Sequence, residues 1–171
     1  MGLDNMPKEY PCALKAARDK DNRIDCVQTQ NENNCTWKSK KESNPMVNHL
    51  SGATSMFGTD CWYRGKYGNF LIGILNGNED YDDSEYNFYG QSEDGLDKYN
   101  CFSMAKWMRD NTEKFAFKAK EYVKNDKRIQ IQLSDEESKP DPLIEYINDW
   151  VYAIWWLEFV GETSNGSAVW W

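Results

Sequence analysis

Residues 141–160 read DPLIEYINDWVYAIWWLEFV, and this stretch decides the fold. Asp141 can cap a helix with its carboxylate, and Pro142 suits the first helical position, where a backbone N–H is not needed. Apolar side chains then cover most of the helical circumference, which is typical of a buried helix. The stretch therefore predicts a central core helix that runs to about Val160 and ends at Gly161.

Two amphipathic helices are predicted before this core helix. From about Asn100 apolar residues recur on one helical face, and lysines decorate the rest of the following segment. Asn111 and Thr112 between the two segments predict a stop and a new start. Cys101 lies on the first apolar face, and we expect it to pack in the core.

Strands are predicted from shorter patterns. Residues 128–133 alternate between polar and apolar, as a half-buried strand does, and residues 168–171 could close the chain as an edge strand. The apolar run 70–75 fits either a strand or a short helix, because periodicity cannot distinguish them over so few residues. Together the patterns predict an α+β fold, with helices mainly in the C-terminal half and a small sheet.

We expect one globular domain over residues 1–171, which suits the chain length and its 40% hydrophobic content. Residues 1–66 form a loop-rich, cysteine-containing part, and residues 67–171 form a helix-rich core. The first part is irregular and poor in apolar periodicity, so a bound metal ion could supply the stability that it lacks.

The composition predicts a soluble, cytoplasmic protein without a membrane partner. The N-terminus shows no basic segment followed by an apolar run, as a signal peptide would. The most apolar run, residues 151–157, is shorter than the roughly 20 residues that cross a bilayer. Glycine-rich nucleotide signatures and a G-x-S-x-G elbow are missing from the sequence.

The four cysteines of the first third are candidate metal ligands. Thiolates at Cys12, Cys26, Cys35 and Cys61 could hold one tetrahedral zinc ion. Their spacing lacks the tight pair of a zinc knuckle, so buried free thiols and disulfides remain alternatives. The single histidine, His49, has no local support for a catalytic or ligating role, and we expect a plain polar contact.

Charge is distributed in blocks along a chain of net charge −8. Residues 67–97 hold eight acids and no Lys or Arg, whereas residues 98–128 hold nine basic and four acidic side chains. Such runs usually mark solvated faces. The acids of residues 79–97 could also attract a basic protein partner, while aromatics between them anchor it. The residues expected to bind this partner are Asp80, Asp82, Asp83 and Glu85.

Three segments resemble one group of proteins. Residues 1–7 (MGLDNMP), residues 57–69 (FGTDCWYRGKYGN) and residues 155–159 (WWLEF) are together similar to uncharacterised proteins encoded by tailed bacteriophages, including marine phages. The resemblance covers most of the chain and carries over no catalytic residue. It implies a small viral accessory protein in the host cytoplasm.

The sequence therefore predicts a non-enzymatic accessory protein that binds a partner and that zinc could stabilise. Direct nucleic-acid binding is not expected, because such proteins are usually basic. The alternative function is that of a small hydrolase-like enzyme with an acidic metal-binding site in residues 79–97. An enzyme should show a pocket with converging polar groups, whereas a binding protein should show an aromatic or charged surface.

Overall fold

The computed structural model describes residues 4–9, 36–50, 52, 61–77, 85–90, 94–134 and 140–170. These residues form six helices and three short strands, which confirms the α+β class. In chain order the elements are β1 (Asp4–Pro7), α1 (Thr36–Glu42), α2 (Gly65–Asn76), β2 (Leu96–Asp97), α3 (Lys98–Asp110), α4 (Thr112–Asn125), α5 (Lys127–Ser134), α6 (Pro142–Thr163) and β3 (Gly166–Trp170).

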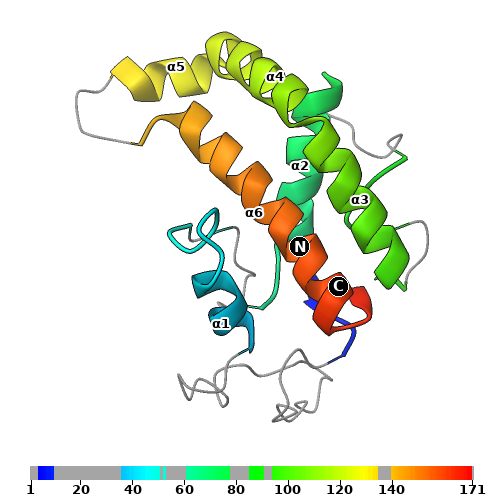
Figure 1. Cartoon of the computed structure of the whole chain (residues 1–171). Helices are drawn as coiled ribbons and strands as arrows, with labels where there is room; N and C mark the ends of the chain where they lie inside the picture. The colour runs from blue at the N-terminus through cyan, green and yellow to red at the C-terminus, as the bar shows by residue number, and fades with distance from the viewer. Residues whose placement is uncertain are drawn as a thin grey trace.

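Helix α6 is the centre of the fold, as predicted. Figure 1 shows it running diagonally through the molecule, with α1 on one side and α3 and α4 on the other. Its start follows the sequence, because the Asp141 side chain accepts a hydrogen bond from the Leu143 N–H at 2.9 Å and Pro142 comes next. Ten of its residues are buried, so the helix contributes much of the hydrophobic core.

The predicted end of α6 at Gly161 is wrong. The helix continues through Gly161 to Thr163, and this glycine lies where α3 comes close. A Cβ atom at Gly161 would lie 3.1 Å from the Phe102 ring and 3.4 Å from Cys101. The glycine thus serves helix packing instead of helix termination, a difference that only the tertiary structure reveals.

The sheet joins the two ends of the chain. Its strand order is β1-β3-β2, and both pairings are antiparallel, with Asn5 opposite Val169 and Leu96 opposite Ser167. The last strand was predicted to lie at an edge, but it is central. That prediction failed because β1 carries no strand pattern and β2 has only two residues.

A buried asparagine explains how the polar strand β1 is held. The side chain of Asn5 is fully buried, and its Nδ2 donates to the Phe88 carbonyl at 2.5 Å and to Ser167 Oγ at 2.8 Å. Gly65, the first residue of α2, leaves the room for this side chain, since a Cβ atom there would lie 1.8 Å from Asn5 Oδ1. Hydrogen bonds of a polar side chain therefore help to position β1, beside the packing of Met6 against the core.

The junction of α3 and α4 lies where the sequence predicts it. Asp97 caps α3 by accepting a hydrogen bond from the Asn100 N–H at 2.7 Å, and Asn111 separates the two helices. The indole of Trp150, on α6, donates to the Met108 carbonyl and to Thr112 Oγ1, both at 3.2 Å. The core helix thus fixes the bend between α3 and α4.

Two segments with short apolar patterns, residues 70–75 and 128–133, are both helical. The apolar run 70–75 belongs to helix α2, one of the two forms that the sequence allowed. The predicted strand at residues 128–133 is wrong, since Lys127–Ser134 form helix α5. The carboxylate of Asp126 accepts hydrogen bonds from the N–H groups of Arg128 and Ile129 at 2.8 and 3.4 Å, and this local cap starts a helix despite the alternating pattern.

None of the helices in the described parts of the chain is long and apolar enough to cross a membrane.

Candidate binding groove between α2 and α4

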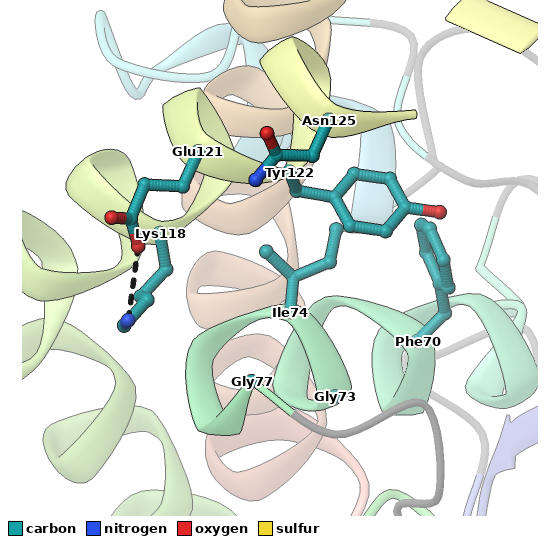
Figure 2. A pocket seen from close by; sticks show the side chains of 8 residues that line it. All are labelled: Phe70, Gly73, Ile74, Gly77, Lys118, Glu121, Tyr122 and Asn125. Atoms are coloured by element: carbon teal, nitrogen blue, oxygen red, sulfur yellow. Dashed lines mark hydrogen bonds and ion pairs between the residues drawn. The ribbon is translucent and has the colours of Figure 1, made fainter. Parts of the chain in front are cut away.

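A groove of about 290 Å³ lies between α2 and α4 (Figure 2). Eight residues line it: Phe70, Gly73 and Ile74 from α2, Gly77 directly after α2, and Lys118, Glu121, Tyr122 and Asn125 from α4. The α2 residues are spaced at i, i+3, i+4 and i+7, so they share one helical face. The groove thus has an apolar side on α2 and a mixed aromatic and polar side on α4.

Two glycines keep the α2 side open. Gly73 and Gly77 lie one turn apart on the groove face and present no side chain. Gly77 ends α2 with φ +67°, and its N–H bonds to the carbonyls of Gly73 and Ile74. Among the described residues, no atom lies within 4 Å of the position that a Cβ atom of Gly77 would take.

The α4 side carries an ion pair at its rim. Lys118 Nζ lies 3.0 Å from Glu121 Oε2, and Figure 2 shows this pair at one end of the groove, away from Phe70. The same Nζ lies 5.8 Å from the centre of the Phe117 ring. Lys118 therefore connects the groove to the outer face of α4.

Aromatic rings form the other end of the groove. Figure 2 shows Phe70 and Tyr122 side by side, and their ring centres are 5.7 Å apart at an angle of 80°. Phe70 also contacts Tyr67 at 5.8 Å and Tyr146 at 6.0 Å. These rings join α2, α4 and α6 in one cluster, which makes this wall rigid.

A half-buried carboxyl group lies behind the aromatic cluster. Tyr67 donates a hydrogen bond from its hydroxyl to Asp149 Oδ2 at 3.0 Å. Burial raises the pKa of Asp149, and the hydrogen bond from Tyr67 opposes that rise. Burial, followed by the charge of Asp149, also raises the pKa of Tyr67. The tyrosine therefore stays a hydrogen-bond donor at neutral pH and holds the carboxyl group in place.

The outer face of α4 is basic with one exposed ring at its centre. We call Lys114, Phe117, Lys120 and Lys124 the α4 surface. Phe117 is 61% exposed, and the three lysines are exposed as well. None of these lysines forms an ion pair with an acid in the part of the chain that the structure describes. The α4 surface thus presents three lysines around an apolar ring, with the exposed Glu113 on the same helix beside them.

A second hollow, of about 480 Å³, lies between α1 and α6. Its charged groups already have partners: Lys40 Nζ lies 2.7 Å from Glu162 Oε1, and Arg109 pairs with Glu158. Trp155 is among its lining residues but is only 8% exposed. The predicted core role of this tryptophan is confirmed, and the hollow offers little free charge to a ligand.

Only one of the four predicted zinc ligands lies among the described residues. Cys61 is buried at 1% exposure, whereas Cys12, Cys26 and Cys35 lie outside the described residues. Among residues that are described, no three His, Cys, Asp or Glu side chains gather as a metal site would require. Cys101 packs in the core as expected, and burial raises the pKa of its thiol to about 12. Zinc binding therefore stays a prediction.

The acidic segment is also described only in part. Glu85 is exposed, as its predicted role requires, and Asp80, Asp82 and Asp83 lie outside the described residues. Two aromatic side chains near these acids face inward rather than toward a partner. Phe88 is fully buried against Tyr63, with ring centres 4.8 Å apart, and Tyr86 stacks on Trp107 at 4.8 Å. His49 is exposed and contacts Asn48, in line with the plain polar role expected.

The lysines of α4 were predicted from the sequence, but the groove was not. One signal was present: Phe117 lies two positions after the buried Phe115, so it cannot share the core face of the same helix. The glycine pair of α2 was a second signal, because two residues without side chains on one helical face leave space against a neighbour.

Comparisons with protein-family models, curated proteins and solved structures find no match to the chain.

Proposed function

We propose that the chain is a non-enzymatic binding protein that docks a partner macromolecule on the groove and the α4 surface. The observation that supports this most is the exposed ring of Phe117, which Lys118 connects to an open, apolar groove. Aromatic side chains set beside a pocket are the usual anchors of protein interfaces, and charges around them steer the partner.

The polar groups of the site suit holding a ligand more than reacting with one. Lys118 and Glu121 are held to each other by an ion pair at the rim of the groove. Asp149 lies behind the rings and is hydrogen-bonded to Tyr67. These contacts order the walls of the groove, and preordered walls reduce the entropy lost on binding.

The proposal also includes the acidic segment, the zinc site and the viral role that the sequence predicts. A basic protein partner would bind the acidic segment 79–97, and zinc would stabilise the cysteine-containing part. The resemblance to tailed-phage proteins supports a viral accessory role against a host or viral macromolecule. No observation on the described residues favours the alternative, a hydrolase-like enzyme with an acidic metal site.

A quantitative pull-down tests the docking surface. Phe117→Ser should reduce partner recovery by at least about tenfold, because hot-spot residues near an interface centre have effects of this size. Tyr99→Ser is the matched control, since Tyr99 is 76% exposed on α3. Equal recovery with both variants would contradict the proposal, provided that both fold like the wild-type chain.

A second pull-down tests the acidic segment. Changing Asp80, Asp82, Asp83 and Glu85 to amides should remove a basic partner, and binding should weaken as salt rises. The control carries the same charge change elsewhere, at Glu9, Asp135, Glu136 and Glu137. Binding that salt does not affect, or that both variants reduce equally, would exclude this surface.

A further inference from the structure

We infer that the groove and the α4 surface bind an acidic peptide segment that carries apolar side chains. This inference rests on the proposed docking surface and adds the chemical class of its ligand. Three features carry it: Lys114, Lys120 and Lys124, which have no ion-pair partner among the described residues, the apolar groove beside them, and the link between the two through Lys118.

The charge of the site is opposite to that of the chain. Residues 112–134 contain six basic and three acidic side chains, although the whole chain has a net charge of −8. Two of the acids are already satisfied, because Glu121 pairs with Lys118 and Asp126 with Arg128. Lys114, Lys120 and Lys124 remain available for carboxylates of a partner, which would both steer its approach and fix its register.

The groove selects for apolar side chains in the same ligand. Phe70, Ile74 and Tyr122 line it, and Gly73 and Gly77 line it without side chains of their own. A cavity of about 290 Å³ is small for a whole domain but sufficient for side chains from one peptide segment. A ligand that places an apolar side chain in the groove brings its neighbouring residues over Phe117 and the lysines.

A peptide fits these features better than a nucleic acid does. Glu113 flanks Phe117 at i−4 on α4, so a phosphate backbone that follows the helix would meet a carboxylate as well as lysines. A short acidic segment can place its few carboxylates at the three lysines alone.

Selection from a library of short random peptides tests the ligand class. The full chain is the bait, and the enriched peptides are labelled with fluorescein and titrated by fluorescence anisotropy. We expect enriched peptides to combine Asp or Glu with Leu or Phe. Their affinity should fall at least about tenfold in Phe117→Ser and in the triple variant Lys114→Gln, Lys120→Gln, Lys124→Gln.

The matched control removes three lysines elsewhere: Lys66→Gln, Lys98→Gln, Lys106→Gln. It should change affinity by less than about threefold, because only long-range attraction is lost. Circular dichroism of every variant shows that the helices are intact.

Several results would overturn the inference. Enrichment of basic or neutral peptides, or no enrichment, would exclude the acidic class. An equal loss in the control triple variant would mean that only overall charge matters. Tighter binding of a single-stranded oligonucleotide, sensitive to the same lysines, would assign the surface to nucleic acid. Affinity that rises when Glu79, Asp80, Asp82 and Asp83 become amides would assign the groove to the chain's own acidic segment.

The ligand class and the docking surface can fail separately. If the acidic peptides fail but Phe117→Ser still removes the partner in the pull-down, the docking surface stands and the ligand class falls. If the acidic peptides bind without sensitivity to Phe117 or the lysines, the docking surface falls.

Discussion

Replacing Trp150 tests the packing that positions the α4 side of the site. Its ring is fully buried and stacks almost parallel on Phe115 of α4, with ring centres 4.1 Å apart at 8°. Removing the ring in Trp150→Ala should lower the free energy of unfolding by about 3–5 kcal/mol, from lost transfer energy and the cavity left behind. For a chain of 171 residues, about 2–4 °C per kcal/mol corresponds to a fall in Tm of about 6–20 °C.

Trp150→Phe separates the ring from its hydrogen bonds. The indole N–H donates to the Met108 carbonyl and to Thr112 Oγ1, and the carbonyl keeps the Thr112 hydroxyl as a donor when the indole is removed. The expected loss is therefore smaller, about 1–2 kcal/mol. Phe117→Ala, at an exposed position of the same helix, should change stability by no more than about 0.5 kcal/mol.

Thermal unfolding followed by circular dichroism, with urea unfolding as a second probe, measures these differences. We expect the free energy of unfolding to be lowest for Trp150→Ala, intermediate for Trp150→Phe and highest for the exposed control Phe117→Ala. A loss of less than about 1 kcal/mol in Trp150→Ala would refute the reasoning, because a ring at an exposed position would give such a value.

Three further predictions concern single groups. Burial raises the pKa of Asp149 above its ordinary 3.8. The folded chain therefore binds this proton more tightly than the unfolded chain does. The stability that protonation provides is present at low pH and is lost as pH rises through the raised pKa. From about pH 4 to about pH 7, the free energy of unfolding of Asp149→Asn should therefore rise relative to that of the wild type. A difference that stays constant with pH would contradict the assignment. Gly77→Ala should lower the free energy of unfolding by about 1 kcal/mol, because of the positive φ alone. Gly95→Ala should lower it further, since a Cβ atom there would lie 2.3 Å from the Ser167 carbonyl oxygen. Equal Tm values for the two variants would contradict this difference. Metal analysis of the purified chain should find close to one zinc, and a chelator should lower the Tm; metal-free protein of unchanged stability would exclude a site at Cys12, Cys26, Cys35 and Cys61.

Local signals in the sequence predicted the elements whose ends depend on their own residues. The start of α6 follows from Asp141 and Pro142, and the break between α3 and α4 follows from Asn111. The end of α6 did not follow, because Gly161 serves contact with Phe102 on another helix. The central place of β3 also depends on a distant partner, the polar strand β1, which hydrogen bonds of Asn5 hold in place.

The groove was harder to predict than the helices that form it. The sequence predicts an apolar element at residues 70–75 and an amphipathic helix that contains Tyr122. It does not predict that the glycines of α2 leave space between two packed helices, since that depends on the distance between the helix axes. The lysines of α4 were visible in the sequence, but coordinates were required to show that Lys118 pairs with Glu121 and that Lys114, Lys120 and Lys124 form no ion pair among the described residues.

The measurement that tests the proposed docking surface most directly is photo-crosslinking from position 117. A photoreactive phenylalanine analogue replaces Phe117 in one sample and Tyr99 in the control. The account predicts one dominant adduct from position 117, joined to a partner segment that contains Asp or Glu beside apolar residues, and little adduct from position 99. A partner that is captured by the chain but crosslinks at position 99 and not at position 117 would contradict it.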